Sequence, residues 1–145
     1  MKTLEKLSDF RIISDFCENN SVSFRELCQN IIAVETDFEV DNFRFIHEDE
    51  IDEIQKDELK SDTYLLGCFN ADFLADIINV PSKAIKALQK AECYSELGEI
   101  CLDYVNEIQK EYSRLDGYGH HFARYDGYTL EDILSISGYY VFRVN

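Results

Sequence analysis

Histidine, aspartate, arginine and tyrosine crowd together in one stretch, between Asp116 and Gly127. General acid–base catalysis needs such groups within reach of a substrate. The candidate polar cluster consists of His120, His121, Arg124 and Asp126. No Ser or Cys nucleophile stands near the histidines, no glycine-rich phosphate loop is present, and strand alternation over residues 121–125 would point the histidines to opposite faces. We therefore expect an aromatic hairpin and no enzymatic activity; a small enzyme with this His/Arg/Asp site is one alternative.

Carboxylates gather in a second stretch, from Glu35 to Asp62, which holds twelve acidic and three basic residues. A rigid row of carboxylates can imitate nucleic-acid phosphates and bind the lysines and arginines of a basic protein, although such a run is often only a solvated face. The leading interpretation is a non-catalytic inhibitor or adaptor that binds a basic nucleic-acid-binding host protein. The partner-binding residues would be Glu48, Asp49, Glu50, Asp52, Glu53, Asp57 and Glu58.

A third pattern, from Leu74 to Leu88, resembles a DNA-binding helix-turn-helix. Ala75 permits a close helix crossing, and Asn79 can take the left-handed turn position usually held by glycine. The second helix would present Ser82, Lys83, Lys86 and Lys90 to DNA phosphates. This segment lacks arginine, however, and the chain has a formal net charge of -15, which repels phosphate. A helix-turn-helix regulator is therefore the alternative, and we expect direct nucleic-acid binding to be disfavoured.

The five cysteines are scattered among apolar residues without CxxC spacing, and only His120 and His121 are adjacent potential metal ligands. This pattern predicts buried, reduced thiols in a cytoplasmic protein with no metal and no cofactor. No apolar run approaches the roughly 18 residues of a membrane span, and the N-terminus lacks the apolar stretch of a signal peptide. We expect no association with a membrane.

Helical periodicity is clear in most of the chain. It predicts helices from Leu4 to Cys17, from Phe24 to Ile32, after Asn70, after Pro81 and through Leu97–Leu115, with Gly98 at a break or a close helix crossing. Ser23 and Glu26 have capping-box spacing, so that Glu26 would reach back to the Ser23 amide. The acidic Glu48–Glu50 would precede a further short helix.

Strand-like segments lie at Phe38–Val40 and Phe43–Ile46, joined by the turn residues Asp41 and Asn42. The aromatic and β-branched run Tyr139–Val144 predicts a terminal strand, with 121–125 as its partner and 43–46 as a third strand. We therefore expect one acidic α+β domain over residues 1–145, with five or six helices and a small antiparallel sheet. The terminal strand could also be an edge that pairs with a second copy, so a homodimer is an open alternative.

Three segments carry a resemblance to a known group: Tyr64–Phe73, Asp116–Gly127 and Tyr139–Arg143. They resemble the C-terminal half of small uncharacterised acidic proteins carried by phages and mobile elements. The resemblance covers the second half of the chain and brings no active site with it. It implies an accessory protein of the kind that phages use against host defence, including inhibitors of restriction or CRISPR systems.

Overall fold

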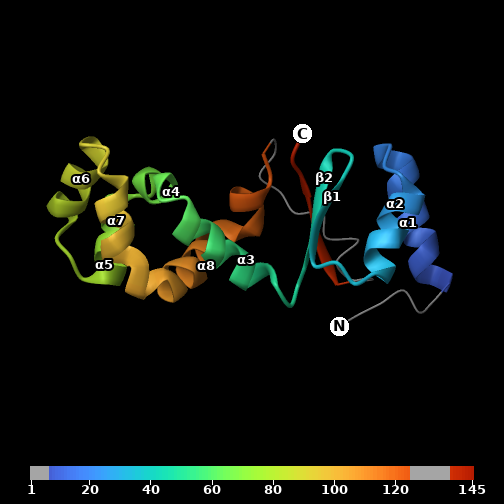
Figure 1. The fold of residues 1–145 in the computed structure, drawn as a ribbon, viewed down its shortest axis with the longest axis horizontal. Helices are drawn as coiled ribbons and strands as arrows, with labels where there is room; N and C mark the ends of the chain where they lie inside the picture. The colour runs from blue at the N-terminus through green and yellow to red at the C-terminus, as the bar shows by residue number, and fades with distance from the viewer. Residues whose placement is uncertain (1–6, 125–137) are drawn as a thin grey trace. The chain divides into compact units, whose positions relative to one another are not determined.

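The computed structural model describes residues 7–124 and 138–145. The chain forms two compact units, which we call the sheet unit and the helical unit (Figure 1). The sheet unit comprises Met1–Ile51 and Asp116–Asn145, and the helical unit comprises Asp52–Leu115. Helices and a small antiparallel sheet that includes a C-terminal strand confirm the predicted α+β class.

The sheet has three antiparallel strands in the order β1 (Asp37–Val40), β2 (Phe43–His47) and β3 (Tyr139–Arg143). Asp41 takes a left-handed conformation with φ of 54° in the tight turn between β1 and β2, as expected of a turn residue. In the register of the second pair, Phe45 lies opposite Val141. The strand 43–46, expected only as a third strand, is therefore the direct partner of the terminal strand.

One face of the sheet packs against α1 (Leu7–Asn20) and α2 (Phe24–Ile32), which lie side by side along it in Figure 1. Phe45 and Val141 are wholly buried in this core, and the Phe16 ring from α1 meets Phe43 edge to face at 5.4 Å between centroids. The Ser23 side chain caps α2 by accepting from the Glu26 amide at 3.2 Å. The expected return bond from Glu26 is replaced, because the Ser23 amide donates to Asp41 at 2.9 Å.

The other face of the sheet is covered by the end of α8 (Val105–Phe122), so the expected strand over 121–125 is wrong for the residues that the structure describes. Tyr118 contacts Tyr140 at 4.9 Å and Phe122 contacts Phe142 at 5.2 Å between ring centroids. Tyr118 and Phe122 are four residues apart, and in a helix residues at this spacing lie on the same face. The aromatic residues of this segment favour a strand, so this helical spacing was missed. Gly117, with φ of 77° and ψ of 164°, bends α8 just before these contacts.

The helical unit is built from short helices. Their bounds are α3 (Ile51–Ser61, of which Ile51 belongs to the sheet unit), α4 (Tyr64–Cys68), α5 (Ala71–Ile78), α6 (Ser82–Lys90), α7 (Tyr94–Cys101), a 3₁₀ turn (Leu102–Tyr104) and the first part of α8. Aliphatic side chains dominate the core, among them Leu59, Leu66, Leu74, Ile85, Leu97 and Ile108. A Cβ on Gly98 would lie 2.5 Å from Cγ2 of Thr63, the residue before α4, so Gly98 is a point of close approach inside α7.

Candidate functional site

The turn between α5 and α6 contains the left-handed Asn79 that the sequence pattern predicted. Asn70 caps α5 by accepting from the amides of Asp72 and Phe73 at 2.8 and 3.3 Å. Asn79 ends α5 in the left-handed conformation, with φ of 58° and ψ of 44°. Pro81 precedes the first residue of α6, where it fits because it has no amide hydrogen to satisfy. Capping, a left-handed turn residue and proline together fix this turn locally.

Two polar contacts hold α6 against the neighbouring helices. The Ser82 hydroxyl donates to the Asp72 carboxylate, which joins the beginning of α6 to the beginning of α5. Gln89 Nε2 donates to the carbonyls of Leu66 and Phe69, at 3.1 and 2.8 Å, where α4 ends. Both side chains are thus engaged within the unit. Of the predicted DNA-binding residues, Ser82 therefore has a clear structural role.

The remaining predicted DNA-binding residues form one exposed row. Ile85 is wholly buried on the inner side of α6, whereas Lys83, Lys86 and Lys90 are exposed. Positions 83, 86 and 90 recur at intervals of three and four residues, so the ammonium groups lie along one side of the helix. We call Lys83, Lys86 and Lys90 the lysine row. The methyl groups of Ala84 and Ala87 are exposed on the same helix.

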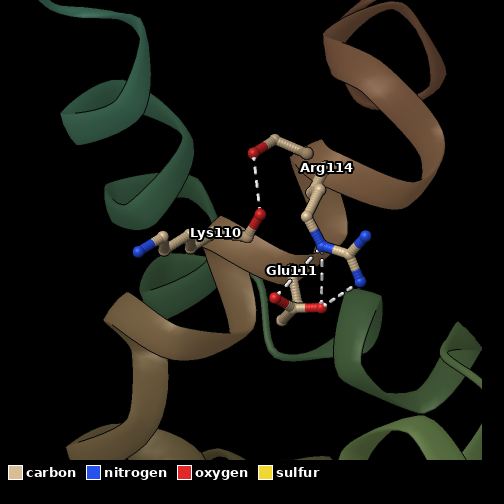
Figure 2. A network of polar contacts seen from close by, with 4 residues as sticks. Lys110, Glu111 and Arg114 are labelled. Atoms are coloured by element: carbon tan, nitrogen blue, oxygen red, sulfur yellow. Dashed lines mark hydrogen bonds and ion pairs between the residues drawn. The ribbon is translucent and has the colours of Figure 1, made fainter.

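The lysine row differs in its pairing from Lys56 and Arg114, two other cations of the helical unit, but not from Lys60 and Lys110, for which the described residues likewise show no ion pair. Lys56 pairs with Glu53 at 2.9 Å, and Arg114 pairs with Glu111 at 2.8 Å (Figure 2). Because Arg114 donates hydrogen bonds to it, the pKa of Glu111 lies below its ordinary value. Helix α6 has no carboxylate of its own, and across residues 7–124 and 138–145 no ion pair to the lysine row is found. Its positive charge is therefore available to an external anion.

The predicted acidic partner-binding residues divide between the two units. Glu48, Asp49 and Glu50 precede α3 in the sheet unit, whereas the other four, Asp52, Glu53, Asp57 and Glu58, lie on α3 in the helical unit. Several of them have intramolecular contacts. An oxygen of Asp49 lies 3.6 Å from His47 Nδ1, Glu53 pairs with Lys56, and Asp52 accepts from Gln109 at 2.8 Å. Part of the acidic stretch is thus engaged by the protein itself.

The polar cluster predicted around the two histidines spreads along the end of α8. His120 is exposed, while the half-buried His121 packs edge to face on Phe122 at 4.6 Å between ring centroids. Consecutive helical residues point about 100° apart, so the imidazoles diverge. Arg124 is exposed beyond the helix, and Asp126 lies outside the described residues. The structure thus does not bring the imidazoles of His120 and His121 to one side of α8.

The cysteines agree only in part with the expectation of buried thiols. All five are free, but Cys68 is exposed and Cys93 is half-buried. Burial raises the pKa of both Cys17 and Cys101 to about 11. These two thiols stay protonated at neutral pH and are poor nucleophiles and ligands. Within the described ranges no cluster of three or more His, Cys, Asp or Glu residues could hold a metal ion.

A buried polar group in the helical unit was not anticipated from the sequence. Gln109 Nε2 donates to Gln55 Oε1 at 3.0 Å as well as to Asp52, and both glutamines are buried. Gln55 stands four residues from Ile51 and from Leu59, in the middle of the buried stripe of α3. An amide at such a position signals a buried hydrogen bond. This pairing attaches α3 to α8, which is a structural role.

No protein-family model, no curated protein and no solved structure matches this chain. Among the described helices, none has both the length and the apolar character needed to cross a membrane.

Proposed function

We propose that this chain is a non-catalytic, cytoplasmic protein that binds double-stranded DNA through α5 and α6. The observation that carries the proposal is the lysine row, three exposed ammonium groups along α6, which is the second helix of a pair that resembles a helix-turn-helix. In proteins with this motif the second helix lies in the major groove. Lysines on such a helix contact phosphates and position it, without selecting a sequence.

The acidic character of the chain limits this binding without abolishing it. Much of the charge comes from residues 35–62, whereas α6 carries three lysines and no carboxylate. At physiological ionic strength, exposed charges separated by more than about 8 Å are largely screened from one another. The field at α6 therefore depends mostly on nearby groups, which include the Asp72 carboxylate beside the start of α6 and the exposed Asp76 on α5 as well as the three lysines. We expect weak binding that is strongest at low salt.

The side chains available for reading bases are small. Ala84 and Ala87 are exposed on α6, and a methyl group can contact the methyl group of thymine in the major groove. Gln89, which could otherwise pair with adenine, donates to two backbone carbonyls inside the unit. We therefore expect modest selectivity, with a preference for sites that contain thymine.

Fluorescence anisotropy with labelled duplex DNA at several salt concentrations tests this proposal. Each phosphate contact contributes about 0.9 to the slope of log affinity against log salt concentration. We expect Lys86→Ala to weaken binding and to lower that slope by about 0.9, because one phosphate contact is lost. Lys110→Ala is the matched control, because Lys110 is an exposed lysine on a different helix, α8. The triple variant Lys83→Ala, Lys86→Ala, Lys90→Ala should abolish binding.

Two results would contradict DNA binding through α6. The first is no change in anisotropy with the unaltered chain, even at low salt and over a range of duplexes. The second is a loss of affinity in Lys110→Ala that equals the loss in Lys86→Ala, because the binding would then not be located on α6.

A second function is favoured by the exposed carboxylates before and along α3. Glu48, Asp49 and Asp57 are all exposed, and residues 35–62 hold twelve acidic residues against three basic ones. In this proposal the chain is a phage or mobile-element inhibitor or adaptor, including the anti-restriction and anti-CRISPR kinds. Its carboxylates would take the place of phosphates on a basic nucleic-acid-binding host protein.

Affinity capture from host cells, followed by a salt titration of the captured complex, tests the second function. We expect Asp57→Lys to weaken capture, with Asp103→Lys as a control on an exposed carboxylate of the 3₁₀ turn. Binding that is equally strong at low and high salt would exclude a role for the carboxylates, since exposed charge pairs are screened by salt.

A further inference from the structure

A groove of about 220 Å³ lies within the helical unit, lined by residues of α3, α4, α7, the 3₁₀ turn and α8. Three of its lining residues, Leu59, Leu66 and Val105, are apolar and almost wholly buried. Leu102 also lines the groove but is 55% exposed. Exposing a large part of a leucine to water costs free energy that a partner surface would recover. The groove thus has an apolar base beside a protruding apolar side chain.

Two opposite charges line the same groove. Lys60, in the last turn of α3, and Glu99, in the last turn of α7, both line it and are both exposed. No ion pair joins them to each other within the part of the chain that the structure describes. A surface complementary to this groove would offer one apolar side chain, one anion and one cation.

We propose that a second copy of this chain occupies the groove. In a two-fold symmetric dimer, the same surface patch faces itself, so the patch must be self-complementary. This patch meets that condition, because Leu102 of each copy can enter the groove of the other. Lys60 of each copy then faces Glu99 of its partner. Unlike charges placed in this way fix the register of the two copies.

Dimer formation would also deepen the proposed DNA binding, and this step alone depends on that proposed function. Helix-turn-helix proteins commonly bind as dimers to two half-sites about one helical turn apart. A single lysine row makes few phosphate contacts. In a dimer, binding of one copy holds the other close to the DNA, so the dimer binds more tightly than one copy alone. The contacts at Leu102, Lys60 and Glu99 stand independently of DNA.

Sedimentation equilibrium over a wide range of protein concentrations tests the dimer. Moderate salt should be used, because it screens the repulsion between two chains of net charge -15. We expect a mass twice that of the 16.9 kDa chain. Leu102→Asp should raise the dimer Kd by roughly a hundredfold or more, because a charge enters the apolar groove twice. Leu115→Asp, at a leucine that is 57% exposed outside the groove, is the matched control and should stay dimeric.

Charge reversal tests the symmetric arrangement itself. Lys60→Glu places two glutamates face to face at each end, and Glu99→Lys places two lysines there. Each single change should raise the dimer Kd by roughly tenfold. The double variant Lys60→Glu, Glu99→Lys restores unlike pairs and should return the Kd close to that of the unaltered chain. Such rescue is not expected if the partner surface is anything other than the same patch.

Three results would overturn the proposal: an unaltered chain that is monomeric at every concentration, a Leu102→Asp variant that still dimerises, or a double variant no better than its parents. Failure of the proposed function looks different. A dimer that binds no DNA leaves this inference intact and removes the DNA-binding function. A monomer that binds DNA at a single half-site removes this inference only.

Discussion

The cores of the sheet unit and the helical unit differ in the side chains that fill them. They also differ in how far apart in sequence their segments lie. Aromatic rings fill much of the sheet unit, where Phe38 stacks on Phe45 at 5.2 Å and meets Tyr139 edge to face at 5.5 Å. Aliphatic residues fill the helical unit, which is one continuous segment from Asp52 to Leu115. The core of the helical unit forms from residues that are near one another in sequence. The sheet is complete only when β3, from the other end of the chain, pairs with β2.

Core substitutions should have the largest effects and should separate the two units. Phe45→Ala removes a wholly buried ring from the sheet unit and should lower its free energy of unfolding by about 3–5 kcal/mol. Leu97→Ala should lower that of the helical unit by about 2–5 kcal/mol. Hydrogen exchange followed by mass spectrometry should show the loss of protection confined to the mutated unit. Equal loss over the whole chain in both variants would show one cooperative unit instead.

Alkaline pH should affect the sheet unit before the helical unit. Burial raises the pKa of Cys17, Cys28 and Tyr139 in the sheet unit, and of Cys101 in the helical unit. A raised pKa means that the folded state disfavours the ionised form. This stabilisation is complete below the unfolded pKa, near 9 for a thiol, and is lost as pH rises toward the folded value, about 11 for Cys17 and Cys101. Three of these groups lie in the sheet unit and one in the helical unit, so the stability of the sheet unit should fall more as the pH rises.

Alkylation of thiols at increasing pH, with the labelled positions mapped by mass spectrometry, checks this order. Cys68 is exposed and should react first. Cys17 should become reactive at a lower pH than Cys101. If Cys101 reacted before Cys17, the proposed difference between the units would be wrong.

Removing one helix cap from each unit should have a smaller effect. Asn70 accepts from two amides at the start of α5, whereas Ser23 accepts from one at the start of α2. Losing such a cap costs about 0.5–2 kcal/mol. We expect Asn70→Ala to lie in the upper half of this range and Ser23→Ala in the lower half. Urea denaturation would measure both, and a larger effect of Ser23→Ala would reverse the expected order.

The smallest expected effect is a gain in stability at a left-handed residue. Val34 follows α2 with φ of 59°, a conformation that is strained for a β-branched side chain, while Asn79 takes φ of 58° after α5. Val34→Gly should stabilise the sheet unit by about 0.5–1 kcal/mol, because the relieved strain exceeds the entropic cost of glycine. Asn79→Gly should change little, because asparagine tolerates this conformation. Thermal melts of the two variants would test the difference.

The parts of the molecule that could be predicted from sequence are those fixed by neighbouring residues. The left-handed Asn79 and the turn at Asp41 follow from local backbone chemistry, and the outward lysine row follows from the helical period around a buried Ile85. Phe122 was placed in a strand because its aromatic neighbours suit one. In the structure Phe122 ends α8 and packs on the Phe142 ring of β3, a contact distant in sequence that local propensity does not include.

The candidate site shows the same division. Exposure of Lys83, Lys86 and Lys90 could be read from spacing, whereas the hydrogen bond from Gln109 to Asp52 joins residues 57 apart and could not. Similarly, the amide of Ser23 is taken by Asp41, eighteen residues away, in place of the expected Glu26. An acceptor so distant in sequence can replace the one that a local motif predicts. The residues around Ser23 do not indicate which distant acceptor its amide will find.

The strand order has a consequence for synthesis of the chain. β1 and β2 emerge from the ribosome before the whole helical unit, but β2 obtains its second neighbour only when β3 follows. During that interval the backbone groups on one side of β2 have no strand partner, and such an edge can pair with another nascent chain. Expression that is slowed before β3 should therefore increase aggregation, and chaperones that cover exposed strands should reduce it.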